Sequence, residues 1–295
     1  MESVIRDYIM SYFNVHNLFS NFQYGFIKGR STVLQLLKVF DAWTSSLDEG
    51  CQVDVIDTDF EKAFDKVPHQ RLLCKLYGYG VNHKVINWIR SFLCFRQQAV
   101  RINGVFANPK PVLSGIPQGS VLGPLLFVIY INDLPDICKE YANTFLYADD
   151  AKLFRQIRDE LDCAKLNSAF ESVHNWCVKW QMSLNIDKCQ VLSISNSKSS
   201  KVTYDYGFST VNNNLTKLSH VSVIKDLGVF VDSDLNFSTH ISDKISMAFK
   251  MLGVIRHSFI NIDKKTFCLL YKSLVRNHLE YANSVWNPYK CTLIA

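Results

Sequence analysis

The sequence lacks any apolar run long enough to cross a bilayer. Its longest, Val121 to Ile131, is too short and contains Gly123 and Pro124. The N-terminus has no basic segment followed by an apolar one, so we expect no secretory signal. No repeat of fixed period is visible along the chain. We therefore expect a globular protein with no membrane partner.

The sequence also lacks the cysteine patterns of zinc sites and disulfide frameworks. The 295 residues include nine scattered cysteines, an odd number, with no Cys-x-x-Cys pair and no accompanying histidine cluster. We expect reduced thiols in the core of an intracellular protein, with nucleus and cytoplasm both open. The cysteines are Cys51, Cys74, Cys94, Cys138, Cys163, Cys177, Cys189, Cys268 and Cys291.

The sequence has no strong excess of positive or negative charge. The net charge is only +5, from 32 basic and 27 acidic residues, and it is spread along the chain. Apolar residues make up 48% and charged residues 20%, which is typical of a globular protein rather than a disordered one. A modest basic excess is compatible with a nucleic-acid partner but does not establish one.

Two adjacent aspartates, Asp149 and Asp150, lie between short segments rich in tyrosine, phenylalanine and leucine. Those residues favour strands and aspartate favours turns, which predicts a β-hairpin with two carboxylates at its tip. Side-by-side carboxylates repel each other unless a cation binds between them, and Mg²⁺ prefers carboxylates together with substrate phosphates. The alternatives are a phosphoryl-transfer site and an ordinary surface turn.

A third carboxylate comes from a strand expected at residues 51–60, where Asp57 and Asp59 share one side by period two. Strand, helices, hairpin, helix and strand follow in an order that suits an α+β, ferredoxin-like antiparallel sheet with helices on one face. The first strand would then lie beside the hairpin. Asp59, Asp149 and Asp150 could together hold two Mg²⁺ ions.

Two glycine-containing loops are candidate ligand contacts. Lys28 and Arg30 lie in residues 23–32, just before a helix that Ser31 or Thr32 could cap; they read either as phosphate contacts or as a solvated loop. Residues 114–124 lead into an apolar helix and read either as backbone that approaches a ligand or as a tight turn. Residues 97–113 predict a hairpin with its turn at Asn103-Gly104. Long helices are expected at about 161–180, 239–256 and 263–286.

Six blocks follow one another along the sequence: Gln23-Tyr24-Gly25-Phe26 with Gly29-Arg30-Ser31-Thr32, Asp59 to Asp65, Ser114 to Ser120, Tyr147-Ala148-Asp149-Asp150, Leu184-Asn185 with Lys188, and Leu227-Gly228. In this order they resemble the reverse transcriptases of non-LTR (LINE-type) retrotransposons. The resemblance implies a right-hand polymerase with partial fingers (1–50), a palm (51–231, with a finger insertion at about 66–113) and a partial helical thumb (232–295). It also implies an RNA template, a DNA primer, RNA–DNA hybrid and dNTPs as partners.

Residue roles follow from this resemblance. Asp59 and Asp149 would ligate two Mg²⁺ ions, or Mn²⁺ as a substitute, with Asp150 in a supporting role. Phe64 would exclude a 2′-hydroxyl, and Lys188 would donate a proton to pyrophosphate. Gln118 and Gly119 would contact the incoming nucleotide and the template. Lys28 and Arg30 would contact phosphates of nucleotide or template.

Departures from the family pattern also set expectations. Upstream finger motifs that grip the triphosphate would precede Met1, Ile27 occupies a place where the family usually has arginine, and no endonuclease domain is present. We expect a chain truncated at both ends, or a degenerate copy, with intact palm chemistry but weak or no activity in isolation.

Rival functions remain open at this point. A viral RNA-dependent RNA polymerase is disfavoured by Phe64 and by Ala148, where such enzymes usually carry glycine. Group II intron and telomerase-type enzymes fit the blocks less well. A catalytically dead nucleic-acid-binding module would keep the aspartates as relics. A metal-dependent phosphodiesterase is disfavoured because no histidine accompanies the aspartates.

Overall fold

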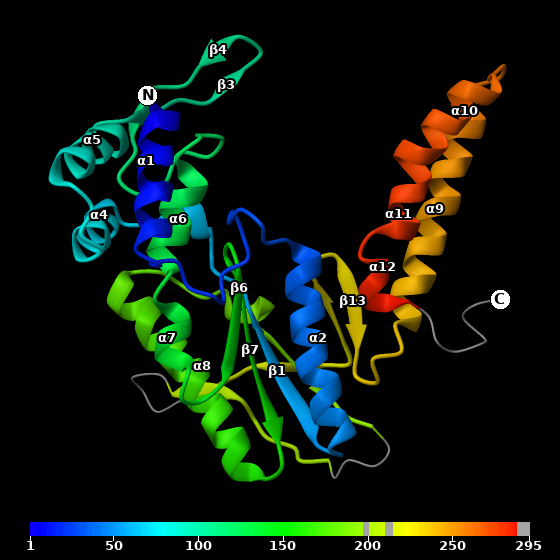
Figure 1. Cartoon of the computed structure of the whole chain (residues 1–295). Coiled ribbons are helices and arrows are strands. Elements are labelled where there is room, and N and C mark those ends of the chain that lie inside the picture. Colours follow the sequence, from blue (N-terminus) through cyan, green and yellow to red (C-terminus); the bar gives the residue numbers. More distant parts are fainter. Residues whose placement is uncertain (197–200, 210–214, 288–295) are drawn as a thin grey trace.

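The computed structural model describes residues 1–196, 201–209 and 215–287 (Figure 1). Residues 197–200, residues 210–214 and the last eight residues of the expected thumb lie outside these ranges. No helix within them is both long enough and apolar enough to span a bilayer.

A five-stranded sheet forms the centre of the molecule, in the order β11-β8-β1-β7-β6. Its strands are β1 (Gln52–Thr58), β6 (Asn143–Tyr147), β7 (Asp150–Ile157), β8 (Gln190–Ile194) and β11 (Ser219–Val221). Strand β1 pairs antiparallel with β7 and β8, and β6 pairs antiparallel with β7. The expected placement of the first strand beside the hairpin is confirmed. The sheet is not wholly antiparallel, because β11 runs parallel to β8.

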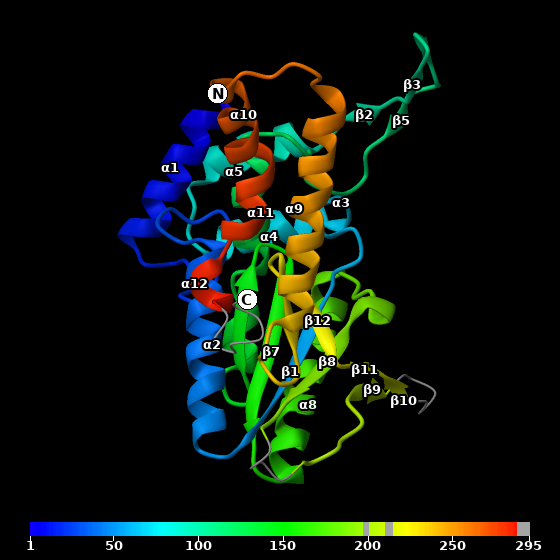
Figure 2. The ribbon, with the colours of Figure 1, turned by 90° about the vertical axis from the view of Figure 1, so that its right-hand side faces the viewer.

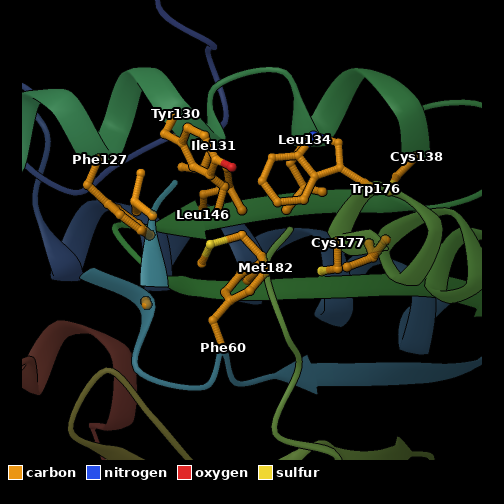
Figure 3. Close-up of a cluster of buried hydrophobic side chains, with 14 of the residues drawn as sticks. Phe60, Phe127, Tyr130, Ile131, Leu134, Cys138, Leu146, Trp176, Cys177 and Met182 are labelled. Carbon is orange, nitrogen blue, oxygen red and sulfur yellow. The ribbon is translucent and has the colours of Figure 1, made fainter. Parts of the chain in front are cut away.

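One face of the sheet is covered by helices α6 (Gly123–Ile131), α7 (Leu134–Cys138) and α8 (Glu160–Trp180). The apolar residues of α8 recur at helical spacing, so one side of this helix is buried. Figure 3 shows Phe127, Tyr130 and Trp176 from these helices packed over Leu146 and Met182. Helices α1 (Glu2–Val15), α3 (Ala63–Lys66), α4 (His69–Gly78) and α5 (His83–Leu93) extend this core beyond one end of the sheet (Figure 1).

The opposite face is covered by helix α2 (Thr32–Asp48) and by the hairpin of β12 (Val223–Asp226) and β13 (Val229–Asp232). The predicted cap of α2 is confirmed, because Ser31 Oγ accepts a hydrogen bond of 3.2 Å from the amide of Leu34. Trp43 of α2 is fully buried against the sheet. The site-bearing hairpin is therefore fixed from both faces.

Short two-stranded hairpins lie outside the central sheet. Strand β3 (Arg101–Ile102) pairs with β4 (Val105–Phe106) through Asn103 and Gly104, whose φ angles of 49° and 86° suit a two-residue turn, as the sequence predicts. Strands β2 (Gln97–Gln98) and β5 (Lys110–Pro111) pair at its base, and β9 (Gly207–Ser209) pairs with β10 (Leu215–Lys217) elsewhere.

The C-terminal region is helical, but its second half is broken. Helix α9 (Ser238–Ser258) lies beside α10 (Lys264–Leu270) and α11 (Arg276–Glu280) in both views (Figure 2). The single helix expected at 263–286 is wrong: a π-helical turn spans Tyr271–Val275, and Ala282 has a left-handed φ of 54° before α12 (Asn283–Trp286). These helices rise on the opposite side of the sheet from α1, α4 and α5 (Figure 1).

Candidate active site

The ends of β1 and of the β6–β7 hairpin meet at one pocket. The β1–β7 pairing ends with Thr58 opposite Ala151, so Asp59 lies next to the hairpin turn. Asp59 and Asp149 both line a pocket of about 440 Å³, with Phe64, Gln118 and Lys188 around it. The remaining lining residues are Phe60, Glu61, Lys62, Ala63, Asp65 and Asn185. Five of the nine residues singled out from the sequence therefore line one cavity.

The turn that presents Asp149 is tight. Tyr147 pairs with Asp150, which leaves only Ala148 and Asp149 as loop residues, and Ala148 has a left-handed φ of 54°. Asp150 is the first residue of β7; it is exposed and does not line the pocket. Among the described residues, no three His, Cys, Asp or Glu side chains gather closely enough to hold one ion. The structure thus brings together two of the three predicted carboxylates.

Burial, and after it the like charge of neighbouring carboxylates, raises the pKa values of these carboxyl groups. Burial raises the pKa of Asp149, against the effect of a backbone hydrogen bond, and the charge of Asp59 raises it further. Although Asp150 is exposed as a residue, desolvation of its carboxyl group, with the charge of Asp149, raises its pKa to about 6. A bound divalent cation would relieve this repulsion. Two carboxylates facing a cavity suit Mg²⁺, which takes its remaining ligands from water and substrate phosphates.

Lys188 reaches the pocket because its loop is tied to the end of β1. The amide of Asn185 donates to the carbonyl of Asp59 at 2.8 Å, and a 3₁₀ turn, Ile186–Lys188, follows. Lys188 Nζ lies 3.5 Å from Asp59 Oδ2, with its side chain 66% exposed. A pair this exposed contributes little to stability. The ion pair therefore matters mainly because it places the Lys188 ammonium group at the pocket.

Phe64 and the glycine loop form another wall. The Phe64 ring stacks on Phe127 with centroids 4.5 Å apart, and its carbonyl accepts from the amide of Ile116 at 2.8 Å. Gly115 has a φ of 92°, and a Cβ there would lie 2.6 Å from the carbonyl oxygen of Asp65. Only glycine permits this close approach.

Gln118 is directed by the same loop. Its Nε2 donates to Asp65 Oδ1 at 2.9 Å, which holds the amide at the pocket. Gly119 is exposed with a φ of 78° and does not line the pocket. Its predicted contact with nucleotide and template therefore stays a prediction.

The two cations predicted to contact phosphate lie outside the pocket. Arg30 Nη1 donates to the carbonyl of Ser20 at 2.7 Å and to the carbonyl of Gln23, so its guanidinium shapes the loop in which it lies. Lys28 is exposed and is not among the pocket residues. A role in phosphate binding stays a prediction for both, and the structure adds a structural role for Arg30.

Sequence reasoning missed a buried charge network beneath the turn. Lys152 of β7 is 3% exposed, pairs with Asp226 at the end of β12, and lies opposite Asp57 in the β1–β7 register. Burial lowers the pKa of Lys152, but Asp226 and Asp57 outweigh burial and raise it. Burial raises the pKa of Asp57 to about 7. The signal was a lysine and an aspartate at inward positions of two strands.

A second missed contact concerns Gln23, which is fully buried against the hairpin turn. Its side-chain Oε1 accepts from the amide of Ala148 at 2.9 Å. A lone glutamine in a polar loop gave no sign of this contact.

Solved structures with the same fold include telomerases. Apo telomerase from Candida tropicalis matches with a TM-score of 0.54 at 11% identity, covering 84% of this chain and 45% of that one. A form truncated from the C-terminal domain matches with a TM-score of 0.53 at 12% identity, covering 78% and 44%. At such low identity the likeness shows the fold alone, a mixed α+β fold resembling telomerase.

Curated relatives include proteins of insect mobile elements. The chain is 29% identical over 299 residues to the RNA-directed DNA polymerase from mobile element jockey of Drosophila funebris, covering 99% of this chain and 30% of that protein. It is 27% identical over 300 residues to the probable polymerase from transposon X-element of Drosophila melanogaster, covering 97% and 31%. The chain thus spans about a third of the length of these relatives.

The family model described as "Reverse transcriptase (RNA-dependent DNA polymerase)" matches residues 1–255. The six sequence blocks, the carboxylates of Asp59 and Asp149 at one pocket and these relatives agree with that match. The resemblance to non-LTR elements is therefore confirmed. This chain belongs to the reverse transcriptase family and is homologous to the enzymes of non-LTR retrotransposons.

Proposed function

We propose that this chain adds dNTPs to a primer 3′-hydroxyl, directed by an RNA template, as the polymerase core of a non-LTR retrotransposon. The observation that carries the proposal is that Asp59 and Asp149, 90 positions apart in sequence, face one pocket together with Phe64 and Gln118. Family membership supports the same chemistry.

The arrangement of elements supports a right-hand polymerase. The strand order β8-β1-β7-β6, with α8 after the hairpin, is ferredoxin-like and supports the assignment of this sheet to a palm. Helices α1, α4 and α5 would belong to the fingers, and α9 to α12 to the thumb.

Asp59 and Asp149 fit a divalent metal, and Asp150 would support them. When bound there, two Mg²⁺ ions, or Mn²⁺ in their place, would supply activation of the 3′-hydroxyl and charge stabilisation of the leaving pyrophosphate. Among the described residues that line the pocket, the basic ones are Lys62 and Lys188. The donor set is therefore suited to a hard cation with phosphate ligands.

The protein's own side chains would bind and orient the substrate. The ring of Phe64 would occupy the space beside the sugar 2′-carbon. The Gln118 amide would hydrogen-bond the nucleotide once released from Asp65. Lys188 Nζ would offset developing negative charge and give a proton to pyrophosphate.

Beyond the pocket, basic side chains would hold the primer–template hybrid. Lys225, Lys244 and His278 surround a cavity of about 350 Å³ between the β12–β13 turn and helix α11. Cationic side chains at a cavity this size would bind phosphates, and this binding would weaken with salt.

The test is primer extension on an RNA template with Mg²⁺, comparing the unsubstituted chain with Asp149→Asn. We expect Asp149→Asn to lower dNTP incorporation by at least about 10²-fold, because charge stabilisation in the transition state is lost. Asp41→Asn, which removes an exposed aspartate of α2, is the matched control and should retain activity. Incorporation that survives Asp149→Asn would contradict the metal site.

Hybrid binding distinguishes the rival function. If the chain binds an RNA–DNA hybrid but shows no metal-dependent extension, and Asp149→Asn binds equally well, the chain is a nucleic-acid-binding module. Extension with NTPs in preference to dNTPs would instead favour an RNA polymerase.

A further inference from the structure

An early segment of the chain, residues 22–25, lies along the outer edge of β6; we call it the strap. The amide of Tyr24 donates to the carbonyl of Leu146 at 2.7 Å, and the amide of Leu146 donates to the carbonyl of Phe22 at 2.9 Å. These bonds make a parallel bridge between Gln23 and Leu146. The strap therefore reaches the hairpin turn directly from the sheet edge.

The Gln23 side chain satisfies both backbone polar groups of Ala148. Its Oε1 accepts from the amide of Ala148 at 2.9 Å, and its Nε2 donates to the carbonyl of Ala148 at 3.4 Å. The same Oε1 accepts from the amide of Gly25 at 2.7 Å, and the residue is 0% exposed. Ala148 is the left-handed residue that immediately precedes Asp149.

Gly25 of the strap lies in close contact with the backbone of the turn. A Cβ at Gly25 would lie 2.3 Å from the amide nitrogen of Ala148 and 3.0 Å from its Cα. Both of these are backbone atoms, which cannot move aside as a flexible side chain could. The strap and the turn therefore fit together only with glycine at this position.

The strap is itself anchored away from the turn. Arg30 donates to the carbonyls of Ser20 and Gln23, and the amide of Ser20 donates to Asn132 Oδ1 at 2.8 Å. Asn132 directly follows α6. The strap thus links the hairpin turn to the end of this helix. A non-glycine residue at φ above zero costs energy and persists only where its surroundings hold it.

We propose that Gln23 is a positioning residue for polymerisation, and that with Gly25 it holds Ala148 in the left-handed conformation that directs the Asp149 carboxylate toward Asp59. The inference rests on the proposed function, because it assigns Gln23 to the same metal site. Gln23 does not line the pocket, so it would act on the metal site through Ala148. Groups that orient a metal ligand in this way typically change metal affinity by about 10- to 100-fold.

The experiment measures Mn²⁺ binding directly, by the electron paramagnetic resonance signal of the free ion, on the full chain. Gln23→Met keeps the approximate volume but removes both hydrogen-bonding groups. Gln35→Met is the matched control, since Gln35 is a buried glutamine of α2, 3% exposed, whose Oε1 has no partner in the part of the chain that the structure describes. We expect Gln23→Met to raise the Mn²⁺ dissociation constant about tenfold or more and Gln35→Met to leave it within about twofold.

A second pair of variants tests the same contact without changing the glutamine. Gly25→Ala should weaken Mn²⁺ binding as Gln23→Met does. Gly78→Ala is its control, because nothing lies within 4 Å of a Cβ at Gly78. Circular dichroism and thermal unfolding establish that each variant is folded.

The outcomes separate the inference from the proposed function. Folded Gln23→Met and Gly25→Ala proteins that bind Mn²⁺ as tightly as the unsubstituted chain overturn the inference alone, provided that Asp149→Asn abolishes binding. Failure of both variants to fold, while both controls fold, also overturns it, because the strap would then serve the fold. If Asp149→Asn binds Mn²⁺ as tightly as the unsubstituted chain does, the proposed function is overturned and the inference with it.

Discussion

Phe64 reaches the pocket because of a local backbone feature. Lys62 adopts a left-handed φ of 49° at the start of α3, which turns the chain sharply after Asp59. The Phe64 ring then lies on Phe127, at an interplanar angle of 22°, and forms part of the pocket wall. A ring fixed by stacking cannot move aside for an extra hydroxyl group.

We therefore predict that Phe64→Val relaxes the choice between dNTPs and NTPs. The smaller side chain should raise the ratio of NTP to dNTP incorporation by about 10- to 100-fold, because a steric wall is removed. Steady-state primer extension with each nucleotide measures the ratio. Phe92→Val, in helix α5 and outside the pocket, is the control and should leave it unchanged. An unaltered ratio in Phe64→Val would exclude this residue as the sugar filter.

At the scale of elements, strand β7 is joined to its neighbours by a charge as well as by backbone bonds. Lys152 of β7 is buried between Asp57 of β1 and Asp226 of β12, and its ammonium group lies 5.9 Å from the Trp43 ring centroid of α2. The lysine therefore interacts with β1 within the sheet and with β12 and α2, which pack on the sheet. Removing its charge would leave the buried carboxyl group of Asp226 and the half-buried one of Asp57 uncompensated.

Lys152→Met should consequently lower the free energy of unfolding by about 3–5 kcal/mol, as for other buried ion pairs that lose one partner. Guanidinium denaturation followed by circular dichroism measures the loss. Lys38→Met, at an exposed position of α2, is the control and should change it by less than about 0.5 kcal/mol. Adding Asp226→Asn to Lys152→Met should restore part of the loss. A loss below about 1 kcal/mol would show that the pair is not stabilising.

At the scale of the whole molecule, His240 joins the C-terminal helices to the rest. It is fully buried, its Nδ1 accepts from the amide of Phe230 at 3.1 Å, and its ring lies 5.0 Å from that of Trp286. Burial, assisted by Lys244 and opposed by Asp243, lowers its pKa from 6.5 to about 4. The unfolded chain therefore binds this proton more readily than the folded one.

The contribution of His240 to the free energy of unfolding should thus be present above pH 6.5 and should fall as the pH drops toward 4. Between pH 7 and pH 5 this histidine should cost about 2 kcal/mol of unfolding free energy. Denaturation at both pH values, compared with His240→Asn, isolates the contribution. The variant should lose about 2 kcal/mol less than the unsubstituted chain over that interval. Equal losses in the two proteins would show that His240 does not sense this change.

The order of motifs predicted much of the molecule, because strand, hairpin and helix patterns are local. It brought Asp59 beside the hairpin, and the pocket confirms that placement. It failed for the helix at 263–286, since neither the π-helical turn nor the left-handed Ala282 interrupts the apolar spacing. The motifs also did not predict that Arg30 hydrogen-bonds the backbone of its own loop. The sequence pattern of a cation in a loop is the same whether the side chain binds a phosphate or a carbonyl oxygen.

The strap also has a consequence for how the chain reaches its native state. Gln23 and Ala148 are separated by 125 residues, so their contact closes a long loop. Such contacts form late, because the entropy of closure must be lost before they stabilise anything. During synthesis the strap leaves the ribosome well before the hairpin that it borders. We therefore expect the turn that carries Asp149 to acquire its final shape only after β6 and β7 have paired and the strap has docked on β6.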